Sequence, residues 1–417
     1  MKNRDSNIIV DVLTIILIVL IFIPQLRLLS QYNYLCLFSS FSLLFFILID
    51  KKYKVKNNPV LQICFIYVLI TSLLPLLFDH RTIFNRYLTL SEVFVFYMVY
   101  DYNKKTWGNK ANMRILFFSL FIILYPTIST LVALSHDGNA CRLIKTSSFE
   151  PGDATYFLLL SGVLGYELIY SVIFISITLF CVLMSGKTAF ISKILRILII
   201  VLIILFTVLV IMSNYFTATV LLVLGYTLAL AISRGAKTLI IIIPVLCIYA
   251  VGRDSINEAV FDVALAVAPE GKTHERIYQM KSNLGKSNVF DDLDSREETS
   301  EKSLKLIGEN PITGYITRSD FQLNNVGQHS YVLDTIAFFG IPIGLFGCYA
   351  MMLPILYYYR KEKLSLLKRI YFIVGAVYLF LLYRNGSSQT VAFCVFFFVP
   401  TVCEHMKGLI YNKIVRL

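Results

Sequence analysis

Long runs of apolar residues, each about the length of a bilayer crossing, recur along the chain. A membrane-spanning helix needs roughly 20 such residues. The runs do not alternate between apolar and polar residues, so they predict helices, which pair their own backbone groups inside lipid, and not the strands of a barrel. Twelve helices are predicted, at residues 8–24, 33–49, 60–78, 87–100, 114–134, 154–184, 194–212, 218–232, 238–250, 331–359, 370–383 and 389–403.

Two predicted helices are longer than one membrane crossing needs, and two predicted loops are longer than a turn needs. The sixth and tenth helices are long and are expected to tilt or bend. Two connections, 135–153 and 251–330, are also long, and loops of such length usually carry a function or are disordered. Within the second, Ser295 with Glu298 predicts a helix start, and Gly308 with Pro311 predicts its end.

The composition agrees with a membrane protein. Of the 417 residues, 57% are hydrophobic and only 15% are charged, against about 25% charged in soluble domains. The mean hydropathy is +0.71. The predicted fold class is an all-α polytopic membrane protein of about twelve transmembrane helices. It forms a single transmembrane domain over 1–417, with one large exterior loop, 251–330, between the ninth and tenth helices.

The net charge of +12 does not indicate a nucleic-acid partner, because of where the charges lie. Of the 38 Lys and Arg, 23 fall in short segments on one predicted side of the membrane, and 6 fall in the short loops on the other. Short cytoplasmic loops carry such an excess of positive charge. The count therefore predicts a multi-pass protein with both termini in the cytoplasm and the long loop outside.

Four carboxylates fall inside or near the predicted spans, where charge is costly and often functional. Asp11 and Asp334 are predicted near span ends, where water is close, whereas Glu92 and Glu167 are predicted deeper. Each has two interpretations: an acid hydrogen-bonded within the bundle, or a functional group. So few charges in the spans argue against an ion-coupled transporter.

The exterior segments hold the residues best suited to chemistry. Asn310-Pro311-Ile312-Thr313-Gly314-Tyr315 is followed by Gly327-Gln328-His329-Ser330-Tyr331 and by Phe339-Gly340-Ile341-Pro342-Ile343-Gly344. His329 is thus predicted at the exterior mouth of the tenth helix. A neutral imidazole there can accept a proton from a hydroxyl near neutral pH. The alternative is that His329 caps the helix or lies at the membrane interface.

This string resembles the signature of the O-antigen polymerase and O-antigen ligase superfamily. The family shows an Arg, here Arg296, a downstream N-P-x-x-G and an H-N or H-S pair before a glycine-punctuated helix. Phe149-Glu150-Pro151-Gly152-Asp153-Ala154, after Arg142, is similar to an element of polysaccharide polymerases, and Arg384 stands where the family often keeps an Arg. The chain departs from the pattern at Ser213-Asn214-Tyr215, where ligases often have S-R-G, and at His329-Ser330 in place of H-N.

The resemblance implies a metal-independent membrane glycosyltransferase with a GT-C-like fold, in the bacterial inner membrane. Its donor would be an undecaprenyl-pyrophosphate-linked oligosaccharide, with no cofactor and no metal. Besides membrane lipids, a chain-length regulator is a candidate partner. A polymerase moves the growing glycan from its lipid carrier to the next lipid-linked repeat unit, whereas a ligase moves it to lipid A core.

The resemblance also implies roles for single residues. His329, Arg296 and Glu150 are the expected catalytic residues, with His329 as base on the acceptor hydroxyl. Arg142, Arg318, Arg384 and Asp153 are the expected substrate-binding residues. Guanidinium groups pair phosphate oxygens in a bidentate manner and can stabilise a leaving pyrophosphate. For each Arg alone, a solvated loop charge or a lipid anchor is an equal alternative.

The favoured interpretation is a polysaccharide polymerase, and the runner-up enzyme is the ligase. A lipid-linked oligosaccharide flippase is a third possibility from another class, but it needs polar groups lining a path through the spans. This chain concentrates its polar residues outside them. A non-catalytic membrane scaffold would not require the string around His329.

Overall fold

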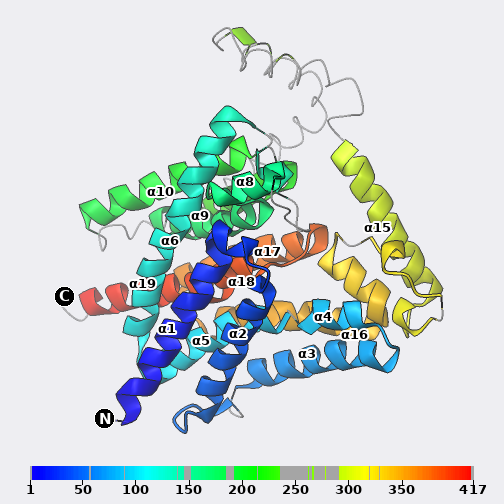
Figure 1. The fold of residues 1–417 in the computed structure, drawn as a ribbon. Helices are drawn as coiled ribbons and strands as arrows, with labels where there is room; N and C mark the ends of the chain where they lie inside the picture. Colours follow the sequence, from blue (N-terminus) through cyan, green and yellow to red (C-terminus); the bar gives the residue numbers. More distant parts are fainter. Residues whose placement is uncertain are drawn as a thin grey trace.

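A computed structural model describes residues 2–55, 58–88, 90–138, 140–144, 152–184, 192–213, 215–234, 262, 265–266, 278, 291–318, 320–327 and 329–414. Within these ranges every regular element is a helix. The helices pack as one bundle, and α15 lies along its edge beside the first part of α16 (Figure 1).

The elements follow the chain in a simple order. Their bounds are α1 (Lys2–Phe22), η1 (Pro24–Leu28), α2 (Tyr32–Ile49), α3 (Pro59–Leu77), α4 (Arg81–Leu88), α5 (Leu90–Thr106), α6 (Asn109–His136), α7 (Ala140–Leu143), α8 (Ala154–Leu160), α9 (Tyr166–Met184), α10 (Lys193–Met212), α11 (Phe216–Arg234), α15 (Asp291–Glu309), η5 (Tyr315–Thr317), η6 (Leu323–Asn325), α16 (Tyr331–Lys361), α17 (Ser365–Arg384), α18 (Gln389–Phe393), the π-helical turn η7 (Cys394–Phe398) and α19 (Val399–Ile414).

Eight described helices are long and apolar enough to cross a membrane, which agrees with the polytopic all-α prediction. They are α2, α3, α6, α9, α10, α16, α17 and the continuous run from α18 to α19. Two shorter apolar helices, 8–22 and 217–233, lie in α1 and α11. The predicted fourth span corresponds to α5, and the predicted ninth, 238–250, lies outside the described residues. The total of twelve therefore stays a prediction.

The prediction of one continuous helix over 154–184 is wrong. α8 ends at Leu160 and α9 begins at Tyr166. Gly162 between them has φ +88°, a conformation that glycine adopts without strain. The Leu164 amide in this break donates to Thr130 Oγ1 at 3.1 Å. A side chain of α6 thus replaces a lost helical hydrogen bond, as a buried backbone amide requires.

The tenth predicted helix is present as α16, but it bends sharply at Gly340, where φ is +81° and ψ is 167°. Its second part packs against its first: a Cβ on Gly344 would lie 2.5 Å from Ile336 Cγ1. Tyr67 of α3 contacts both parts, since its hydroxyl lies 2.5 Å from the Tyr331 hydroxyl and its ring abuts Gly347. α16 is therefore two helical segments packed on each other, and Tyr67 bridges them.

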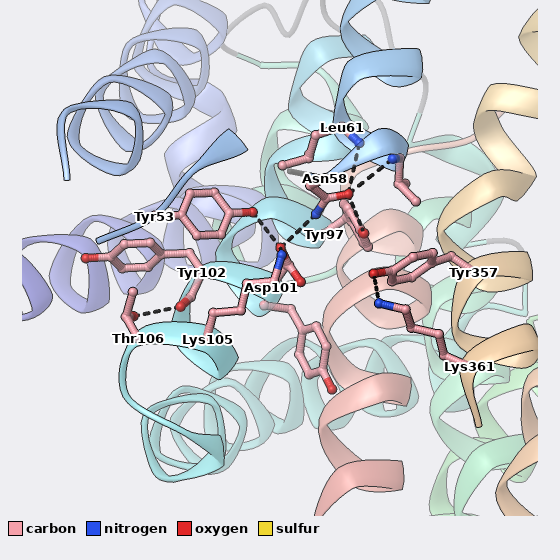
Figure 2. A network of polar contacts seen from close by, with 12 residues as sticks. Tyr53, Asn58, Leu61, Tyr97, Asp101, Tyr102, Lys105, Thr106, Tyr357 and Lys361 are labelled. Carbon is pink, nitrogen blue, oxygen red and sulfur yellow. Dashed lines mark hydrogen bonds and ion pairs between the residues drawn. The ribbon is translucent and has the colours of Figure 1, made fainter. Parts of the chain in front are cut away.

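Polar side chains fasten α5 to the loop before α3 (Figure 2). Asp101 Oδ2 accepts hydrogen bonds from the Tyr53 hydroxyl at 2.6 Å and from Asn58 Nδ2 at 2.7 Å, and Lys105 Nζ lies 2.7 Å from the same oxygen. Asn58 Oδ1 in turn caps α3 by accepting from the Val60 and Leu61 amides. One buried carboxylate thereby fixes the start of α3 against α5.

Ion pairs join the N-terminal helix α1 and the C-terminal helix α19 to α6 and α5 at one end of the bundle. Arg114 of α6 pairs with Asp11 of α1 at 2.8 Å, and Lys104 of α5 pairs with Glu404 of α19 at 2.7 Å. Figure 1 likewise shows both termini on the same side of the molecule. That both termini lie on the cytoplasmic side of a membrane stays a prediction.

Hydrogen bonds and an ion pair join the opposite end. Arg27 of η1 pairs with Glu167 in the first turn of α9, and the Glu167 carbonyl accepts from Thr390 Oγ1 of α18 at 3.1 Å. The prediction that Glu167 lies deep in a span is wrong, because the break at 161–165 makes α9 begin one residue before it. Its carboxylate is balanced by Arg27 at the end of the bundle.

We expect Asp101→Ala to lower the midpoint of thermal unfolding of the detergent-solubilised protein by several degrees. The substitution leaves the Tyr53 hydroxyl and Asn58 Nδ2 without their buried acceptor, and a hydrogen bond to a charged group contributes about 1.5–3 kcal/mol. Glu301→Ala, which removes an exposed carboxylate from α15, is the control. Equal midpoints for the two variants would contradict the importance of this network.

Candidate functional site

The helix α15 carries Arg296 and is docked on α16 through a buried serine. Ser303 Oγ donates to Asp334 Oδ1 at 2.8 Å and accepts from the Gly327 amide at 3.1 Å. Ser303 and Asp334 are both buried. One hydroxyl thus links α15, the segment that precedes His329 and the first turn of α16. α15 ends at Glu309 as predicted, but it begins at Asp291, so the predicted start at Ser295 is wrong.

The Asn-Pro-x-x-Gly segment is packed into the bend of α16. The Pro311 carbonyl accepts from the Ile341 amide at 2.7 Å. A Cβ on Gly314 would lie 2.2 Å from the Phe338 carbonyl oxygen, and one on Gly340 would lie 2.1 Å from that of Ile312. Both glycines have positive φ. The two glycine motifs, separated in sequence, therefore meet backbone to backbone, at a distance that no side chain would permit.

His329 lies where the sequence predicts, two residues before α16, and its side chain is exposed. The adjacent Ser330 is the N-cap, because its Oγ accepts from the Leu333 amide at 3.1 Å. Capping is thus done by Ser330. The capping interpretation of His329 is not needed, and its side chain is exposed to solvent.

Arg384 is brought to the same mouth by the last loop of the bundle. The Tyr331 amide donates to the Asn385 carbonyl at 3.2 Å, so the end of α17 lies against the start of α16. Arg384 is half-buried. No ion pair joins it to a carboxylate within the described part of the chain. Arg384 and His329 therefore flank one backbone contact, although 54 residues separate them in sequence.

Arg318 is already engaged by acids. Its Nε and Nη2 donate to the two Asp320 carboxylate oxygens, each at 2.7 Å, and its Nη1 donates to Glu309 Oε2 at 3.0 Å. The hydrogen bond from Arg318 lowers the pKa of the Asp320 carboxyl below its usual value. To bind a phosphate, Arg318 would have to exchange these partners.

The remaining predicted site residues are described to different extents. Arg296 lies on α15 and Arg142 on α7, where the structure describes the backbone and not their side chains. Asp153 is exposed at the N-terminus of α8. Glu150 lies outside the described residues. The structure thus brings the backbone near His329 and the backbone near Arg384 to one end of the bundle, and leaves the side-chain positions of Arg296 and Arg142 as predictions.

A chain of contacts connects α7 with the α16 mouth. The Tyr215 hydroxyl donates to the Cys141 carbonyl at 3.1 Å, and its ring centroid lies 6.4 Å from that of Tyr170. The Tyr170 hydroxyl accepts from Asn385 Nδ2 at 2.9 Å. The backbone that carries Arg142 is therefore held at the same end of the bundle as His329 and Arg384.

His80, which the sequence analysis did not single out, also contacts this region. Its Nε2 donates to the Ile316 carbonyl at 3.0 Å, and its ring centroid lies 4.1 Å from that of Phe321. Because a carbonyl only accepts, Nε2 carries a proton here. His80 stands in the turn between α3 and α4 with no motif around it, so only the fold reveals that it supports the segment 311–321.

No family model matches this chain, and no curated protein matches it.

We expect Gly314→Ala and Gly340→Ala to disrupt the packing of 310–314 on α16, because each added Cβ would overlap a backbone carbonyl. Protease cleavage between α15 and α16 in the detergent-solubilised protein should become faster. Gly308→Ala is the matched control, since a Cβ there meets nothing within 4 Å and alanine favours the helix by about 1 kcal/mol. Cleavage unchanged in all three variants would contradict this close approach.

Proposed function

We propose that this chain is a polysaccharide polymerase of the O-antigen type, an enzyme of the bacterial inner membrane. It would transfer a growing glycan from undecaprenyl pyrophosphate to a hydroxyl of the next lipid-linked repeat unit. One observation carries the proposal: the Asn-Pro-x-x-Gly segment packs against the bend of α16, and the exposed His329 precedes the start of that helix, where the end of α17 with Arg384 lies. A scaffold would have no need to gather these residues at an exposed histidine.

The reaction requires the protein to stabilise the leaving pyrophosphate and to accept a proton from the acceptor hydroxyl. The bond between the sugar C1 and the pyrophosphate oxygen breaks, so negative charge develops on the leaving group beside lipid that cannot solvate it. The acceptor hydroxyl loses its proton as the new glycosidic bond forms. Positive charge held in advance near the leaving oxygen is a large catalytic contribution, and a positioned base adds about 10²–10⁴-fold.

His329 is the proposed base. Its side chain is exposed at the start of α16. The backbone on both sides of it is held in place, because Ser330 caps the helix and the Gly327 amide donates to Ser303. A group held by packed neighbours keeps the geometry that proton transfer requires. Glu150 and Asp153, in the polymerase-like element before α8, are the proposed partners of the acceptor sugar.

Arg384 is the leading candidate for the pyrophosphate among the arginines whose side chains are described. It adjoins the α16 mouth, and no described carboxylate pairs with it, whereas Arg318 is neutralised by Asp320 and Glu309. Arg296 and Arg142 complete the proposed set. Arg318 would then take part only after exchanging its acidic partners for the phosphate.

Deleting the gene in its native host separates the candidate activities by the surface glycans seen on a gel. Core that carries a single repeat unit, with the ladder of longer chains gone, is the expected result for a polymerase. Core without repeat units, with polymer still on its lipid carrier, would instead assign the ligase. Repeat units retained on the cytoplasmic face would assign the flippase.

We expect His329→Ala to reduce polymer formation about 10²–10⁴-fold, the contribution of a general base, while the protein still inserts into the membrane. Polymer length and amount would be measured on gels after complementation of the deletion strain. His136→Ala removes an exposed histidine near the end of α6 and should leave the ladder unchanged. Normal long chains from His329→Ala would remove the assignment of the base.

Arg384→Ala should lower turnover of the lipid-linked donor roughly 100-fold, in line with the loss of one preorganised donor to a developing anion. Arg318→Ala should cost less, because its guanidinium is already occupied by acids. Purified variants would be compared at varied donor concentrations. A larger loss for Arg318→Ala than for Arg384→Ala would reverse this order of importance.

A further inference from the structure

A cavity of about 190 Å³ lies between α9, α11 and α17, at the end of the bundle that holds both termini. It is formed by the last turns of α9 and α11 and the first turns of α17, and Ile410 of α19 also lines it. The proposed active site lies at the opposite end, where α9 and α11 begin and α17 ends. The cavity is therefore separate from that site by the length of the spans.

The lining divides into an apolar wall and a polar rim. Met184, Ile232 and Ile373 are among the apolar residues, and Ser233, Ser365 and Arg369 supply the polar groups. Apolar and polar residues both come from the last turns of α9 and α11 and the first turns of α17. The cavity thus places an apolar wall beside a guanidinium and two hydroxyls, a combination that suits a lipid with an acidic headgroup.

The charge at the rim is positive and not balanced. Arg369 is exposed, and none of the described carboxylates forms an ion pair with it. Two other cations at this end of the bundle do have acidic partners: Lys407 pairs with Glu362 at 3.2 Å, and Lys104 pairs with Glu404. Ser365 is the first residue of α17. The Glu362 carboxylate accepts from the Lys363 and Leu364 amides at this helix end and pairs with Lys407, so the positive charge at the rim comes from Arg369.

We propose that this cavity binds an acidic phospholipid, whose phosphate contacts Arg369 and the hydroxyls of Ser365 and Ser233 and whose acyl chain lies along the apolar wall. Basic pockets between helices on the cytoplasmic side suit anionic headgroups, and the distribution of Lys and Arg predicts that this side is cytoplasmic. The cavity is smaller than the roughly 300–1,000 Å³ of sites for soluble ligands. Only part of a lipid, the phosphate and the first part of an acyl chain, would therefore lie in it.

The inference does not depend on the proposed glycosyl transfer, and its test measures binding alone. The full chain would be delipidated in detergent and titrated with phosphatidylglycerol or with phosphatidylcholine of the same acyl chains. Bound lipid would be counted by native mass spectrometry. We expect one phosphatidylglycerol to bind the wild type more tightly than phosphatidylcholine does.

Three variants test separately how the charge of Arg369, the space in the cavity and the general surface charge affect phosphatidylglycerol binding. Arg369→Gln should weaken phosphatidylglycerol binding about fivefold, the contribution of one cation near an acidic lipid. Lys368→Gln is the control, because it makes the same charge change on α17 but its Nζ lies over the Tyr359 ring, 4.9 Å from the centroid. Ala229→Leu, which fills the cavity and keeps the charge, should also weaken binding, and Ser233→Leu serves if that variant does not fold.

Three results would overturn the proposal. The first is equal loss of phosphatidylglycerol in Arg369→Gln and Lys368→Gln, which would indicate attraction to the general surface charge. The second is equal binding of the two lipids by the wild type. The third is release of the lipid by millimolar inorganic phosphate, which would assign the site to a soluble anion.

Discussion

The hydrogen bond from the Ile341 amide to the Pro311 carbonyl joins the segment 310–314 to the bend of α16, and much of the candidate site depends on it. An unpaired backbone amide in apolar surroundings costs several kcal/mol. The bend is thus possible because 310–314 supplies an acceptor, and 310–314 can approach because Gly314 and Gly340 lack side chains. α15, the segment before His329 and the first turn of α16 are then held by Ser303 and Asp334.

Ion pairs stabilise both ends of the bundle. At the end with the termini they join helices far apart in sequence, and the carboxylate of Asp101 fixes α5 to the start of α3. At the other end Arg27 pairs with Glu167, and a backbone hydrogen bond between Tyr331 and Asn385 holds the start of α16 against the end of α17. Because that contact uses backbone groups, it leaves the side chain of His329 exposed beside it.

The candidate site could be predicted in part. The order of Arg296, Asn310-Pro311, Gly314, His329 and Gly340 in the sequence predicts an exterior segment and the mouth of a helix. The structure shows His329 exposed two residues before α16. The sequence could not reveal that Arg318 is already paired with Asp320 and Glu309, because local charge patterns do not specify rotamers. Nor could it reveal His80, whose contact with Ile316 spans 236 residues and exists only in the folded chain.

The sequence by itself determined that this is an all-helical membrane protein, because the cost of unpaired backbone in lipid makes long apolar runs helical whatever their neighbours are. It also indicated that both termini share one side. Only the tertiary structure decided where helices break. The sequence predicts continuous helices over 154–184 and 331–359, and glycine permits a break without requiring one. A break forms where another segment supplies the missing hydrogen bond, as Thr130 does for Leu164 and Pro311 does for Ile341.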